Sequence, residues 1–120
     1  MTVFEFDGKK LPLLFTLEAW ERMEAEVCTL DELFEMCRQH TRVETIQKII
    51  QVAVILSRAA DAQPPTSYDE LHKLSPGMAF VLQGAVMAAV TEGLDFEGNK
   101  KSGPRDLVLE ELDKQEGKNA

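Results

Sequence analysis

The chain has 120 residues, 44% of them hydrophobic and 28% charged, which is typical of one soluble globular domain that needs neither metal nor disulfides. Its net charge of −8 argues against a nucleic-acid-binding protein, because phosphate contacts need clustered Lys and Arg. The first residues, MTVFEFDGKK, lack a basic start and a long apolar run, so we expect no signal peptide and a cytoplasmic protein. Cys28 and Cys37 are then expected to be reduced and to act as small core residues.

Residues 2–16 predict a β-hairpin. Asp7-Gly8 is a strong turn signal, and Phe4 and Phe6 fall on one face of the first strand. The return strand, expected over 11–15, contains Pro12, which indicates an edge position. A two-stranded hairpin is not stable alone, so one face must lie on helices or on another subunit.

Four helices are predicted to follow, each with a start signal. Thr16 is an N-cap for a helix over 17–27, with an apolar stripe of Leu17, Trp20, Met23 and Val27. Three capping boxes mark the starts of the other helices. Thr29–Glu32 opens a short helix whose inward face is Leu30, Leu33, Phe34 and Cys37. Thr41–Glu44 opens the longest helix, over 43–60, and Ser67–Glu70 opens a one- to two-turn helix that ends near Leu74. The prolines of residues 63–66 form a linker before the last of these.

Residues 74–91, LSPGMAFVLQGAVMAAVT, predict a helix that carries no charged side chain. Ser75 is its N-cap, Pro76 its first residue and Gly93 its expected stop. A helix that is apolar all round must be buried, either in its own domain or against another molecule. We expect it not to cross a membrane, because no basic cluster flanks it and it is interrupted by Ser75, Pro76, Gly77, Gln83 and Gly84.

The predicted fold is mainly α: a small helical domain of about five helices with an N-terminal β-hairpin, over residues 1–93. Residues 94–120 are expected to form a flexible loop and a weak C-terminal helix over 104–115, with the apolar set Leu107, Val108, Leu109 and Leu112. The short helices and one hairpin supply little surface to cover two apolar helices. We therefore expect part of the 74–91 helix, around Gln83, Gly84 and Ala88, to meet a second subunit or another protein.

Nothing in the sequence indicates an enzyme, a cofactor or a metal. His40 and His72 are far apart, and the spacing of Cys28, Cys37 and His40 matches no zinc pattern. Glu18, Glu21 and Glu26 belong to an acidic group that is either a solvated face or a docking surface for a basic partner. Trp20 is either a core residue or, if exposed, an interface anchor.

The order of parts resembles the tail assembly chaperones of long-tailed bacteriophages and related prophages. The resemblance lies in the hairpin TVFEFDGKKLPLLFT, the segment LEAWERMEAEVCTLDELFEM and the long apolar helix that follows, and it covers residues 1–60 best. It implies a small, non-enzymatic helical protein of the host cytoplasm that binds the tape-measure protein and helps recruit tail-tube subunits. It also implies, for some members, a longer form made by ribosomal frameshifting near the C-terminus.

Self-association through the hairpin or the apolar helices is expected on this reading. The alternative hypothesis is an acidic helical adaptor or inhibitor that binds a host protein through its negative surface. This hypothesis rests on the net charge of −8 and on the acidic residues of the first predicted helices.

Overall fold

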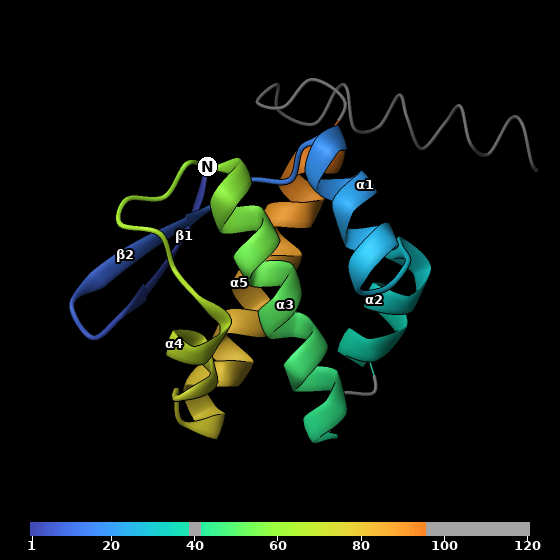
Figure 1. Cartoon of the computed structure of the whole chain (residues 1–120). Coiled ribbons are helices and arrows are strands. Elements are labelled where there is room, and N and C mark those ends of the chain that lie inside the picture. Colours follow the sequence, from blue (N-terminus) through green and yellow to red (C-terminus); the bar gives the residue numbers. More distant parts are fainter. Residues whose placement is uncertain (39–41, 96–120) are drawn as a thin grey trace, which may run out of the picture.

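A computed structural model describes residues 1–38 and 42–95 and confirms a mainly α domain with an N-terminal hairpin. The elements are β1 (Thr2–Phe6), β2 (Lys9–Leu13), α1 (Leu17–Glu26), α2 (Leu30–Arg38), α3 (Val43–Ala59), α4 (Tyr68–His72) and α5 (Pro76–Leu94) (Figure 1). The hypotheses about Thr41, His40 and the 104–115 helix lie outside the described residues.

The hairpin closes through the predicted Asp7-Gly8 turn. Asp7 has φ +48° and Gly8 has φ +74°, the left-handed conformations that a tight type I′ turn requires. β1 and β2 pair antiparallel with Phe4 opposite Leu11 and Thr2 opposite Leu13. The return strand therefore occupies 9–13, earlier than the predicted 11–15, because a two-residue turn starts the second strand at once.

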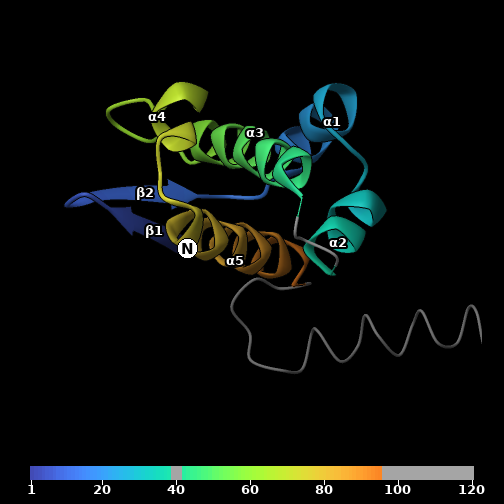
Figure 2. The same cartoon turned by 90° about the horizontal axis from the view of Figure 1, so that it is seen from below.

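The core lies between the hairpin and the two long helices. α3 and α5 pack against each other, β2 lies against α3, and β1 lies against α5. Figure 2 shows the strands beside α3 and α5, with α1 and α2 at the other end. The backbone N–H of Leu14 donates to the carbonyl oxygen of Leu56 at 3.1 Å, which fixes the end of the hairpin to α3. The expectation that one hairpin face lies on the helices is thus confirmed.

Most predicted helix starts are confirmed by capping bonds. Thr16, Ser67 and Ser75 each accept from a backbone N–H three residues on. Thr29 and Glu32 form the complete box, since each backbone N–H donates to the other residue's side chain, at 2.8 and 3.1 Å.

α3 begins at Val43, as predicted, but its capping is different. Its N-cap is Arg42, which makes no side-chain capping bond, and the backbone N–H groups of Thr45 and Ile46 donate to the Arg42 carbonyl instead. The helix does not depend on a capping box because Ile49 to Ser57 are buried, apart from Gln51.

Three further predictions were wrong. Leu17 is 74% exposed, because the side of α1 that faces α3 carries Ala19 and Met23. The longest helix is α5, with 19 residues against 17 in α3. Gly93 does not stop α5, which continues to Leu94; a Cβ on Gly93 would lie 2.5 Å from the backbone oxygen of Phe15, so glycine permits a close approach there.

Candidate functional site

α5 buries one side and exposes the other. Its buried residues are Ala79, Leu82, Gln83, Val86, Ala89 and Val90, which follow one another at the helical repeat. On nearly the opposite side lie exposed residues that we call the open stripe: Gly77, Phe80, Val81, Gly84, Ala88, Thr91 and Leu94. Only one face of the apolar helix is therefore buried within its own domain, and the opposite face is exposed.

The open stripe carries no charged side chain, and Thr91 is its one polar residue. Val81 is 54% exposed, Phe80 45% and Leu94 39%. Between them, an added Cβ at Gly84 would meet no atom within 4 Å. In Figure 2, α5 lies at one border of the described domain, and no described helix or strand lies beyond it on the side away from α3. A continuous exposed apolar strip of this kind is typical of a surface that binds another helix or protein.

The structure separates the three α5 residues predicted to lie at an interface. Gly84 and Ala88 are exposed and belong to the open stripe. Gln83 does not: it is 9% exposed, and its side-chain Nε2 donates to the carbonyl oxygen of Cys37 at 3.4 Å. Gln83 therefore ties α5 to the end of α2 and belongs to the core.

An apolar cavity of about 340 Å³ extends one end of the open stripe. It lies between the first turns of α3 and α5 and the short helix α4, and Phe80 belongs to both the cavity wall and the stripe. Its other apolar walls are Val43, Ile46, Ile50, Leu71, Leu74, Pro76 and Ala79. The cavity could not be predicted from the sequence, because it forms where α3 packs against the later pair α4 and α5.

Polar groups near the cavity have ordinary structural surroundings. Arg42, on its wall, is bonded to Glu44 at 3.4 Å, and the ring of His72 stacks on Tyr68 with centroids 5.3 Å apart. Among the described residues, no three His, Cys, Asp or Glu side chains are grouped so that they could hold a metal ion. The cavity is suited to apolar contact.

Trp20 lies between the core and the surface. Its ring packs against Phe15 with centroids 5.7 Å apart, and its Nε1 donates to Glu24 at 2.9 Å. The ring is half-buried and its polar edge faces the solvent side of α1. Trp20 is therefore neither fully buried nor fully exposed, and Glu24 acts as its hydrogen-bond acceptor.

Glu18, Glu21 and Glu26 are all exposed on α1. Glu18 shares a shallow depression with Arg22 and Arg58, and Glu26 lies beside Arg58 in the next one. The acidic group is thus interrupted by two cations, which weakens its field toward a basic partner. Both depressions are formed by residues outside α5, so the acidic residues and the open stripe are separate surfaces.

Both cysteines lie within the fold: Cys28 is buried and Cys37 is half-buried. Burial, together with the neighbouring Cys28, raises the pKa of Cys37 to about 11, and burial also raises the pKa of Cys28. A raised pKa keeps a thiol protonated and unreactive, as expected for core residues.

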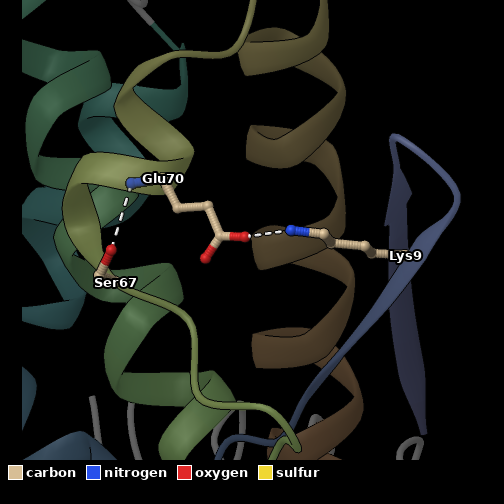
Figure 3. A network of polar contacts seen from close by, with 3 residues as sticks. All are labelled: Lys9, Ser67 and Glu70. Atoms are coloured by element: carbon tan, nitrogen blue, oxygen red, sulfur yellow. Dashed lines mark hydrogen bonds and ion pairs between the residues drawn. The ribbon is translucent and has the colours of Figure 1, made fainter.

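An exposed ion pair joins the hairpin to α4. Lys9 Nζ lies 2.6 Å from Glu70 Oε2, while the backbone N–H of Glu70 donates to Ser67 Oγ (Figure 3). Glu70 was predicted to complete the Ser67 capping box, but its carboxylate turns to Lys9 instead. The pairing lowers the pKa of Glu70 and raises that of Lys9.

By length and composition alone, α5 is the one helix in the described ranges that could cross a membrane. A core helix passes the same test, and α5 packs against α3 and β1 along its buried side.

Comparisons of the chain with family models, with curated proteins and with solved structures found no match.

Proposed function

We propose that this protein is a non-enzymatic phage tail assembly chaperone that holds an apolar helical client on the open stripe of α5. The observation that supports the proposal is the stripe itself, in which Phe80, Val81 and Leu94 remain 39–54% exposed in a folded domain. The client suggested by the family resemblance is the tape-measure protein, and tail-tube subunits are the second partner. Both encounters take place in the cytoplasm of the host.

The chemistry of the stripe limits the kind of client. Residues 76–94 carry one charged side chain, Glu92, so affinity must come from apolar contact and close packing. Gly84 and Ala88 carry no large side chain, and an added Cβ at Gly84 would meet no atom within 4 Å, so the ridge of a second helix can approach α5 closely there. The net charge of −8 keeps a protein with such a surface soluble.

The test is co-expression with the tape-measure protein encoded beside this chain, followed by affinity purification. The wild-type protein is expected to co-purify with it. Val81→Asp places a charge in the centre of the stripe and should lower the apparent affinity at least about tenfold, since a buried unpaired charge costs well over 1.4 kcal/mol.

The matched control is Leu17→Asp, which introduces the same charge at another exposed apolar residue, on α1. It should leave binding unchanged. Failure to co-purify when both proteins are soluble would overturn the chaperone proposal. Binding that ignores Val81→Asp but weakens steeply with salt and on Glu18, Glu21 and Glu26→Gln would instead favour the acidic adaptor.

A further inference from the structure

We propose that the outer edge of β1 binds an extended segment of a partner protein, which adds a third strand to the hairpin, antiparallel to β1. Among the described elements, β1 pairs only with β2. In a hairpin closed by a two-residue turn, the flanking residues Phe6 and Lys9 exchange both backbone hydrogen bonds, and every second pair along the ladder does the same. The backbone N–H and C=O groups of Val3 and Glu5 therefore point away from β2.

The outer edge of β1 is open in the part of the chain that the structure describes. Outside the hairpin, no backbone–backbone hydrogen bond joins Val3 or Glu5 to another described residue. The Val3 residue is 45% exposed, and Glu5 is exposed as well. A strand edge with unpaired backbone groups is a template for pairing with another extended chain.

The outer edge of β2 is protected in three ways. Pro12, which lies opposite Val3, has no N–H to donate. Lys9 is held to Glu70 of α4 by the 2.6 Å ion pair, and β2 lies on the side of the hairpin toward α4 (Figure 2). Prolines, lysines and covering helices are the usual means by which a protein blocks an edge strand. β1 contains neither proline nor lysine, so we expect the added strand on the β1 side.

The sheet is also narrower than the layer of helices on which it lies. α3 and α5 pack against each other, β2 lies against α3, and β1 lies against α5. Two packed helices have axes about 8–10 Å apart, whereas neighbouring strands are only about 4.8 Å apart. A third strand beside β1 would therefore lie over the part of α5 that the hairpin leaves uncovered.

The same distances favour a strand that brings no helix of its own. If a second copy of this chain paired through β1, a two-fold axis perpendicular to the sheet would place both α5 helices on the same face. The two β1 strands would be about 4.8 Å apart, but the helices packed on them need about 8–10 Å and would overlap. The occupant is therefore an extended segment of a partner and not a second hairpin of this fold.

The side chains of β1 specify the pattern of that segment. The residue opposite Glu5 lies on the solvent face beside an exposed carboxylate, where lysine or arginine is favoured. The residues opposite Phe4 and Phe6, whose side chains are buried, point toward the helices and should be apolar. The ligand class is thus an apolar strand with a basic residue on its solvent face. This proposal rests on β1 and not on the open stripe, so it is independent of the proposed function.

The probe is the acetylated and amidated peptide Val-Lys-Val-Thr-Val, added to the full-length protein and followed by NMR spectra of the backbone amides. In the antiparallel register its lysine lies opposite Glu5 and its threonine opposite Val3, so the N–H groups of these two peptide residues donate to carbonyl oxygens of β1. We expect saturable shifts and slower hydrogen exchange at the Val3 and Glu5 amides.

N-methylated peptides separate backbone pairing from side-chain contact. Methylation of the lysine and threonine amides removes two hydrogen bonds and should lower the affinity at least about tenfold, which corresponds to about 1.4 kcal/mol. Methylation of the central valine amide is the matched control. Its N–H points away from β1, so the affinity should hardly change.

Two variants of the protein test the same edge. Val3→Pro removes an outward N–H and should weaken peptide binding while the hairpin stays folded, since Pro12 already occupies the facing position on β2. Glu5→Lys keeps every backbone group; it should weaken binding of the lysine peptide and strengthen binding of a peptide with glutamate in its place. Absence of saturable shifts at millimolar peptide, or equal affinities of the two N-methylated peptides, overturns the proposal. A wild-type dimer that Val3→Pro converts to a monomer also overturns it, in favour of a second copy paired through β1.

Discussion

Two glycines of α5 offer a paired test of the packing described above. Gly84 and Gly93 are nine residues apart and therefore project from opposite sides of the helix. An added Cβ at Gly84 would meet no atom within 4 Å, whereas at Gly93 it would lie 2.5 Å from the oxygen and 2.8 Å from the Cβ of Phe15. The same substitution should therefore have opposite effects on the free energy of unfolding.

For Gly84→Ala, the gain is the helix propensity of alanine over glycine, about 0.8–1 kcal/mol. For Gly93→Ala, a similar gain is opposed by steric overlap with a backbone atom that cannot rotate away. Overpacking costs about 1–3 kcal/mol. Gly93 lies near the end of the helix, where replacing glycine by alanine stabilises less than at the centre. We therefore expect Gly93→Ala to lower the free energy of unfolding by about 1–2 kcal/mol.

Urea unfolding followed by circular dichroism measures both variants against the wild type. The urea midpoint should rise for Gly84→Ala and fall for Gly93→Ala. In thermal unfolding, the melting temperatures of the two variants should differ by about 10 °C or more, since 1 kcal/mol shifts the melting temperature of a domain of this size by about 4–8 °C. Equal stabilisation by both substitutions would refute the close approach of Phe15 to α5. Loss of stability in Gly84→Ala would refute the open stripe.

Three further measurements examine other features. Because burial raises the pKa of Cys28 and of Cys37, the latter to about 11, both thiols should react only slowly with a disulfide reagent at pH 8 and rapidly in concentrated urea; fast labelling of the folded protein would contradict their burial. The Lys9–Glu70 pair lowers the pKa of Glu70, so its stabilisation is present above the ordinary value of 4.5 and is lost as the pH falls through the folded-state pKa; the raised pKa of Lys9 places the other limit above 10.5. A double-mutant cycle of Lys9→Met and Glu70→Gln should give a small coupling energy at pH 7 that decreases as the pH falls below 4.5, and a coupling that is unchanged by acid would exclude the pair as its source. Ser75→Ala removes the bond from the Met78 N–H to Ser75 Oγ and should lower stability by about 1 kcal/mol, while Ser75→Asp should largely preserve it; equal losses would mean that the cap is not formed.

The local features of the fold could be predicted because each depends on residues close in sequence. The Asp7-Gly8 turn and the caps at Thr16, Thr29 and Ser75 follow from the conformations and hydrogen bonds that those residues favour. The burial of α3 follows from its run of apolar residues.

The orientation of α5 could not be predicted, because composition does not indicate a direction. With apolar residues on every side, neither the core side nor the open side of the helix stands out, and a polar residue, Gln83, lies in the core while Phe80 and Val81 are exposed. The buried amide of Gln83 has one partner, since its Nε2 donates to the Cys37 carbonyl 46 residues away in the chain, whereas its Oε1 has no hydrogen-bond partner among the described residues. One local signal was present: Gly77, Gly84 and Thr91 repeat every seven residues, marking the side where no large side chain is needed.

Packing of β1 against α5 has a consequence for synthesis on the ribosome. The apolar face of the hairpin, with Phe4 and Phe6, is completed by a helix that ends at Leu94. At about 5–20 residues per second, the hairpin leaves the ribosome several seconds before α5 does. For that interval the nascent chain carries two unsupported strands with an exposed aromatic face, and the last helix of the domain must arrive before the first element can be held in place.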